Sequence, residues 1–419
     1  MSAPTVENVV TQVRRLRWIS IVVWVLALAP LLQIALHPEN FQWDFRLFYS
    51  AGLAADAGVN PYDSGLRNAI YPAPSMEFFY PPLTLYLFEL LKYLPYESAT
   101  LLWIALKLAA FAVLVTLWHK KFEPLNPGYP IVLFFVFAYS GTLYLDIAAG
   151  NIAIFEQLII WLGFYFFIER KFLLFGLCVA LASQFKLQPI VLLGLLLIVE
   201  ERPRWLALLG SIAAFLGLLV LNYLLQPDLT LAFINRLRTG GGNLYELGVI
   251  NPSLLALVQD VVNAVGTRIH SMPVGTARGL FGLLLCLIAT VFLYFFISFR
   301  RRNPNYDLRI LVYISCFLYA VTAARMKDYS YVICLLPTLV MIRRQMSRKE
   351  FIPLLAVLVC APADTSYVPF LSRISNYFYD YLPLLLAGTM LAVYLYELRK
   401  HDGAGLTPDS RAGQPRAGV

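Results

Sequence analysis

Long apolar runs separated by short polar or basic stretches constrain this chain more than any other feature. At 1.5 Å per residue, about 20 residues make a helix of ~30 Å, the thickness of a bilayer's hydrocarbon core. Such runs cover residues 17–36, 97–118, 129–148, 152–168, 204–225, 276–299, 308–324, 328–342, 351–363 and 381–398. With 59% hydrophobic and 14% charged residues, the chain has too few polar side chains to cover a soluble globule. We therefore expect an all-α polytopic membrane protein.

The apolar run at residues 172–199 does not fit a single span. About 28 residues would make a helix of ~42 Å, longer than the bilayer is thick. The segment QFKLQP at residues 184–189 also interrupts it, and basic residues flank both of its ends. The positive-inside rule predicts a hairpin of two short helices, because a single crossing would place Arg300, Arg301 and Arg302 outside. This threading gives about twelve spans, with both ends of the chain in the cytoplasm.

Two external loops, residues 37–96 and 226–275, are much longer than the connections of about two to eight residues that are usual in helical bundles. Residues 81–95 are too short to span, and residues 254–265 follow the capping segment Asn251-Pro252-Ser253. Both stretches predict interfacial helices. We expect residues 1–400 to form one membrane-embedded domain. Residues 401–419, rich in Gly, Pro, Ala and Arg, are expected to form a disordered cytoplasmic tail.

The sequence lacks the motifs that several classes of function require. No GxGxxG segment, Walker loop or Asp-x-Asp pair is present, which argues against a nucleotide site. The five cysteines lie in apolar runs, so no disulfide framework is implied. The formal charge of +8 comes from short basic clusters between the runs, which orient membrane proteins, so we expect no nucleic acid partner. The four histidines lie far apart and predict no zinc site: His37, His119, His270 and His401.

Chemistry-bearing residues gather at the start of the first external loop. Asp44 lies among Trp43, Phe45 and Phe48, and an apolar setting raises the pKa of a carboxyl toward the range of a general base. The alternative is that Asp44 caps the helix that follows. Arg46 and Tyr49 also lie directly after the first span and are further candidates.

Three basic positions are candidates for holding an anion. Lys186 lies at the tip of the predicted hairpin, below the external surface, where a cation usually faces a cavity or an anion. Alternatively, it snorkels to the interface. Arg325 and Lys327 could clamp a phosphate, with Asp328 orienting them, or could belong to an ordinary solvated turn.

Two further arginines precede a glycine triplet. Arg236 and Arg238 come before Gly240-Gly241-Gly242. This segment would serve either as a mobile lid or as a contact with lipid headgroups.

Four segments, in order and in register, resemble those of one enzyme family. They are WDFRLFYSAGLAADAGVNPYD (residues 43–63), FFYPPLTLYLFELLKYLP (78–95), GNIAIFEQLIIW (150–161) and GLCVALASQFKLQP (176–189). The chain resembles glycosyltransferase family 87, the polyprenyl-phosphate-sugar-dependent mannosyltransferases of the GT-C superfamily. NPSLLALV (251–258) and RMKDYSYVICLLP (325–337) extend the resemblance more weakly.

The resemblance implies a GT-C fold of about twelve spans, a lipid-phosphate sugar as donor, and an acid early in the first external loop as catalytic base. By motif position that acid is Asp44. Tyr80, Asn151 and Tyr329 lie in the same segments and join the candidate site. The chain departs from many members at Gly150-Asn151, where Gly-Gln is frequent, and at Lys327-Asp328, where some carry histidine. Mannose is the family default, and arabinose, glucose and other hexoses remain open.

These observations combine into one hypothesis. Lys186, Arg325 and Lys327 hold the phosphate of a polyprenyl-phosphate sugar. Asp44 deprotonates a hydroxyl of a glycolipid or glycan acceptor, which displaces the phosphate with inversion. The resemblance places this reaction on the periplasmic or exterior face of a bacterial cytoplasmic membrane. The mechanism requires no metal or other cofactor, and a divalent metal is compatible with it.

Two other readings stay open. A transporter or lipid flippase would also use a broken hairpin and a buried lysine, although the two halves of the chain show no repeat. A scaffold for envelope assembly would explain the long external loops, but not the grouping of charged and aromatic residues at one mouth.

Overall fold

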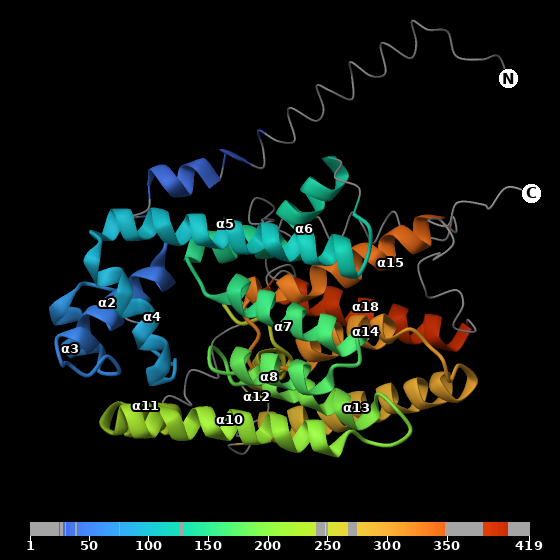
Figure 1. The fold of residues 1–419 in the computed structure, drawn as a ribbon. Helices are drawn as coiled ribbons and strands as arrows, with labels where there is room; N and C mark the ends of the chain where they lie inside the picture. Colours follow the sequence, from blue (N-terminus) through green and yellow to red (C-terminus); the bar gives the residue numbers. More distant parts are fainter. Residues whose placement is uncertain are drawn as a thin grey trace, which may run out of the picture.

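The computed structural model is helical in all the regular structure of its described residues (Figure 1). The structure describes residues 31–37, 40–74, 76–125, 129–239, 248, 250–266, 275–347 and 380–400, with Val25, Leu28 and Ala29. The predicted span at 351–363, most of the span at 17–36, the glycine triplet at 240–242 and the tail at 401–419 lie outside the described residues.

Four helices are long and apolar enough to cross a membrane. They are α5 (Tyr96–Lys121), α10 (Trp205–Leu225), α13 (Thr276–Arg302) and α18 (Leu382–Lys400), and each falls on a predicted span. Only 11% of the most apolar window of α10, and of that of α13, is buried inside the protein. Their remaining apolar surface needs a non-aqueous solvent. The chain is therefore an integral membrane protein.

The α6–α7 pair forms a fifth candidate span, but a broken one. Within α6 (Tyr129–Ala149) the backbone leaves helical geometry at residues 138–141. The segment Phe134–Ala149 then meets α7 (Ala153–Ile168) at a bend of 117°. The sequence predicted two spans here, at residues 129–148 and 152–168, and it did not predict the break inside α6 or the bend between the helices.

The number of about twelve spans remains a prediction, because the other apolar helices of the described residues are shorter. The run at 172–199 does fold as two short helical pieces separated by residues 183–187, as predicted. The shorter helices are α8 (Phe172–Ala182), η4 (Gln188–Gly194) continued by α9 (Leu195–Ile198), α12 (Leu254–Gly266), α14 (Leu308–Thr322), and the 3₁₀ helix η6 (Asp328–Cys334) continued by α15 (Leu335–Ser347).

Most of the short helices from the two long loops, residues 37–96 and 226–275, gather at one end of the molecule, beside the start of α5 (Figure 1). Their aromatic and aliphatic side chains form a core of their own, separate from the larger core between α5, α7, α14 and α18. The helices are α2 (Trp43–Asp56), α3 (Ser64–Ile70), η2 (Pro82–Thr84), α4 (Leu85–Glu89), η3 (Leu90–Tyr93) and α11 (Pro227–Thr239).

The predicted interfacial stretch at 81–95 consists of three consecutive short helical pieces, η2, α4 and η3. It buries Leu85 and Phe88 and exposes Leu90 and Tyr93. The predicted cap of α12 is also present, because the Ser253 hydroxyl accepts a hydrogen bond from the Ala256 N–H at 3.3 Å. The position of both helices at a lipid surface remains a prediction.

The turn between α6 and α7 is the point on which α2 docks. Gln42, just before α2, donates its backbone N–H to the Ala148 carbonyl at 2.7 Å and its side-chain amide to the Ile147 carbonyl at 2.6 Å. Gly150 ends the turn at φ +69°, in the left-handed region that favours glycine. A Cβ on Gly150 would lie 2.5 Å from Gln42 Oε1 and 2.6 Å from Phe45 Cβ. Only glycine lets α2 approach this closely.

We expect Gly150→Ala to destabilise the protein by about 2 kcal/mol or more, because it combines an unfavourable φ with a clash against α2. The midpoint of thermal unfolding in lipid or detergent measures this loss. The control is Gly217→Ala in α10, where a Cβ would meet nothing within 4 Å; it should leave the midpoint unchanged or raise it slightly. Equal midpoints for the two variants would contradict the close approach.

Candidate active site

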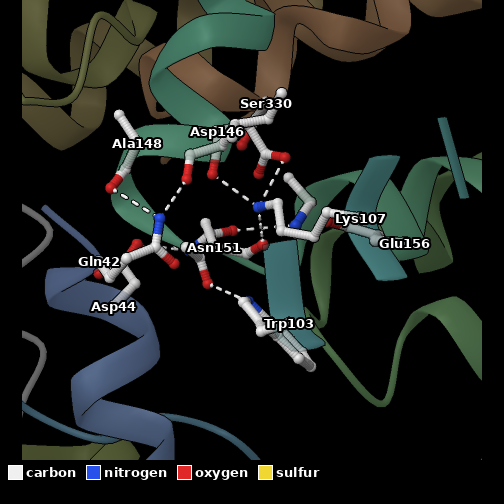
Figure 2. A network of polar contacts seen from close by, with 12 residues as sticks. Gln42, Asp44, Trp103, Lys107, Asp146, Ala148, Asn151, Glu156 and Ser330 are labelled. Carbon is white, nitrogen blue, oxygen red and sulfur yellow. Dashed lines mark hydrogen bonds and ion pairs between the residues drawn. The ribbon is translucent and has the colours of Figure 1, made fainter. Parts of the chain in front are cut away.

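Asp44 lies in the first turn of α2 and points into the protein. The helix begins after Gln42, so Asp44 is the second helical residue and not its cap. The alternative reading of Asp44 as an N-cap is therefore wrong. Its side chain is 3% exposed, and its Oδ2 accepts a hydrogen bond from Asn151 Nδ2 at 2.7 Å (Figure 2).

Asn151 is held at both ends of its side chain. Its Oδ1 accepts a hydrogen bond from the Ala153 N–H at 3.0 Å, in the first turn of α7. This contact leaves the amide Nδ2 directed at Asp44. The orientation of the carboxylate is thereby coupled to the start of α7.

A buried ion pair lies behind Asn151 (Figure 2). Lys107 of α5 contacts Asp146 Oδ2 of α6 at 2.8 Å, and both side chains are fully buried. The Lys107 ammonium also donates to the Asp146 carbonyl at 2.6 Å and to the Asn151 carbonyl. One turn earlier on α5, the Trp103 indole N–H donates to the Gly150 carbonyl at 2.8 Å. Helix α5 thus binds both ends of the turn.

Sequence reasoning missed most of this cluster. Lys107, Asp146, Glu156, Trp103 and Gln42 were not among the candidate site residues. The available signal was the presence of isolated charges inside apolar runs, which is rare unless the charges are paired or functional.

Lys186 lies between α8 and η4, opposite Asn151. Its ammonium is 3.1 Å from Glu156 Oε2 and donates to Ser330 Oγ at 3.2 Å. It also lies over the Tyr329 ring, 5.2 Å from the centroid. Glu156 is 1% exposed, so the ammonium is directed to partners inside the protein and does not snorkel.

The segment at 324–331 is tied down and is not an ordinary solvated turn. The Arg325 carbonyl accepts from Gln188 Nε2 at 2.5 Å, and the Met326 N–H donates to Asn251 Oδ1 at 2.7 Å. The Asp328 carbonyl accepts from Thr142 Oγ1 at 2.5 Å. These contacts fix the segment against α6, η4 and the residues that precede α12.

The charges around Asp44 act on its pKa in opposite directions. Burial raises the pKa of Asp44 above its ordinary value, and this is the largest effect. The positive charge of Lys327, the hydrogen bond from Asn151, and the charges of Lys107 and Lys186 all lower it, but the net direction is upward. A carboxylate with a raised pKa is a better proton acceptor.

The predicted site residues divide into those near Asp44 and those that lie away from it. Tyr80 and Tyr329 lie within electrostatic reach of Asp44, together with Asn151, Lys186 and Lys327. Arg325 stacks over the Phe79 ring, 5.8 Å from the centroid, beside Tyr80 in the chain.

Arg46 and Tyr49 do not join this group in the structure. Arg46 lies over the Tyr96 ring at 5.4 Å, and the Tyr49 hydroxyl donates to the Leu94 carbonyl at 2.9 Å. Both side chains attach α2 to the start of α5.

Arg236 is anchored as well. It forms an ion pair with Glu77, which joins α11 to the loop before η2. Both readings of this segment, a lid and a headgroup contact, remain predictions.

The arrangement offers a proton acceptor. A buried carboxylate, fixed by an amide, lies within electrostatic reach of Lys327, Lys107 and Lys186. Within the described residues, no group of three His, Cys, Asp or Glu side chains could hold a metal ion.

Comparison with known proteins gives one family. The model of glycosyltransferase family 87 matches residues 78–324, more than half of the chain. The match includes Asn151 and Lys186, whereas Asp44 precedes it and Arg325 and Lys327 follow it. None of the curated proteins compared with the chain matches it.

The Lys186–Glu156 pair allows the structural and chemical roles of Lys186 to be separated. Lys186→Met leaves Glu156 buried without its ammonium partner, and we expect it to destabilise the protein by about 3 kcal/mol. Lys186→Met combined with Glu156→Gln removes both charges and should recover most of that loss. Thermal unfolding of the two variants measures the difference. If the double variant were no more stable than the single one, the two residues would not be coupled as a pair.

Proposed function

The chain belongs to glycosyltransferase family 87, and on that premise we propose the reaction that it catalyses. It transfers a sugar, mannose by family default, from a polyprenyl-phosphate donor to a glycolipid or glycan acceptor, with inversion. The reaction takes place on the extracytoplasmic face of a cell membrane, within one domain of about twelve spans formed by residues 1–400. The observation that carries the proposal is the buried carboxylate of Asp44, fixed by Asn151 beside a cluster of cations.

The cations supply the binding site for the donor phosphate. Lys186 keeps 20% of its side chain exposed while it pairs with Glu156, so a phosphate can approach the ammonium without first breaking the pair. Arg325 and Lys327 lie on the neighbouring segment. Positive charge next to a phosphate leaving group stabilises the charge that develops on it, which makes an acid catalyst unnecessary.

Asp44 supplies the base. The acceptor oxygen attacks the anomeric carbon as the bond from that carbon to the phosphate oxygen breaks, and the electron pair leaves with the phosphate. The hydroxyl proton passes to the Asp44 carboxylate. A single displacement of this kind inverts the anomeric configuration, and it needs one carboxylate, not two.

A transporter or flippase for lipid-linked sugars is the second candidate. The interrupted helix around Lys186 favours it, because discontinuous helices with a charged residue at the break are typical of transporter binding sites. Movement of labelled lipid across liposomes without a new glycosidic bond would support this candidate over the transferase.

Asp44→Asn should lower sugar transfer by at least about 100-fold, because it removes the base without changing the size of the side chain. The assay follows label from polyprenyl-phosphate mannose into a membrane glycolipid extract with purified protein in lipid. Asp56→Asn is the matched control, since Asp56 lies on the same helix and pairs with Lys92 at the surface. Full activity of Asp44→Asn would rule out the assigned base.

Transfer should also fall on acidification, with a midpoint above the ordinary carboxyl range of about 4. Asp44 works as a base only when deprotonated, and burial raises its pKa. Lys327→Met should move the midpoint further up, because the Lys327 charge lowers the pKa of Asp44 more than any other neighbouring charge. Profiles of kcat/KM between about pH 4 and pH 8 measure both effects. A midpoint that did not respond to Lys327→Met would contradict the assignment.

A further inference from the structure

We propose that Lys107 and Asp146 are positioning residues that hold the α6–α7 turn, so that the Asn151 amide fixes the Asp44 carboxylate. The inference deepens the proposed function and rests on it for its catalytic meaning. The geometric link itself can be tested without any sugar.

Lys107 is committed to the turn. Its ammonium donates to the Asp146 and Asn151 carbonyls and lies 2.8 Å from Asp146 Oδ2 as an ion pair. Its side chain is fully buried. It therefore cannot contact a substrate and acts only through the turn.

The acceptors of Lys107 stand on both sides of the turn. Asp146 belongs to α6, and Asn151 directly precedes α7, which bends away at 117°. The Asn151 N–H donates to the Asp146 carbonyl at 3.2 Å, which closes the turn from within. One side chain from α5 thus connects two helices whose relative direction decides where the Asn151 amide points.

Trp103 and Gln42 also bind the α6–α7 turn. Trp103 binds the Gly150 carbonyl, and Gln42 binds the carbonyls of Ile147 and Ala148. Five carbonyls of the turn, those of residues 146, 147, 148, 150 and 151, are bound by groups from outside the α6–α7 pair. A turn needed only as a connection would not require contacts from two other elements.

Stability alone is a weak reason for an ion pair at this place. Burying two charges costs about as much as their attraction returns, and apolar replacements of such pairs are often neutral. The alternative is that the pair provides geometry. Here the geometry that it sets is the position of Asn151, whose Nδ2 lies 2.7 Å from Asp44 Oδ2.

The test measures the titration of Asp44 directly in the full chain in lipid nanodiscs. Infrared difference spectra between acidic and neutral pH, with the Asp44→Asn spectrum subtracted, isolate the protonated carboxyl band of Asp44. The charged groups within electrostatic reach of Asp44 are Lys327, Lys107, Lys186 and Asp146, with Tyr80 and Tyr329 as neutral neighbours. A variant that replaces only Lys107 and Asp146, and leaves the other neighbours of Asp44 unchanged, reports on the contacts that hold the turn.

The main variant is Lys107→Met with Asp146→Asn, which removes one charge of each sign and keeps both side chains near their original size. We expect the Asp44 midpoint to rise by about one pH unit, because the hydrogen bond that stabilises the charged form is lost. Asn151→Ala should give the same rise, and the two changes combined should give no more than either alone. Lys92→Met, which breaks the exposed Lys92–Asp56 pair, is the control and should leave the midpoint unchanged.

A folded double variant with the wild-type midpoint would overturn the proposal. A rise that simply adds to that of Asn151→Ala would also overturn it, since the pair would then act without Asn151. Should the double variant not fold, Trp103→Phe decides, because it removes the hydrogen bond to the Gly150 carbonyl and keeps an aromatic ring at that position: a raised midpoint supports the proposed role of the turn, and an unchanged one contradicts it. If Asp44→Asn kept its transfer activity, the proposed function would fail while these spectra still tested the link.

Discussion

The contact of the Lys107 ammonium with both ends of the α6–α7 turn is the interaction on which the site depends. It closes a bend of 117° between two apolar helices. The bend brings Gly150 against α2 and turns the Asn151 amide toward Asp44. Without a fixed turn, Gln42 would lose its partners before α2 and Asp44 would have no partner of fixed position.

The charges near Asp44 follow from the low polarity of their surroundings. A carboxylate in such a setting requires a partner. Asp146 and Glu156 each have a lysine, Lys107 and Lys186. Asp44 accepts a hydrogen bond from the Asn151 amide. An amide orients a carboxylate without neutralising it, so Asp44 keeps the capacity to take up a proton.

The sequence predicted features that depend on local composition. The spans at α5, α10, α13 and α18 follow from run length, and the interruption of residues 172–199 follows from its polar segment and flanking charges. Asp44 was found because its aromatic neighbours are adjacent in the chain and because the surrounding segment resembles a known family.

Features that depend on tertiary contacts were not predictable. Lys107 and Asp146 lie 39 residues apart. The local sequence around either residue does not indicate that the other is its partner. The break inside α6 lies within a predicted apolar run, and the short gap between residues 148 and 152 gave no indication of the 117° bend. Arg46 was grouped with Asp44 by proximity, but two residues along a helix point in different directions, and Arg46 meets Tyr96 instead.

The most direct measurement is an experimental structure of the chain in lipid with a non-transferable polyprenyl-phosphate sugar bound. The account predicts that the phosphate lies within hydrogen-bond distance of Lys186 and of Arg325 or Lys327, with the anomeric carbon open on the side of Asp44. A phosphate bound elsewhere, or a sugar whose anomeric carbon is shielded from Asp44, would contradict the account.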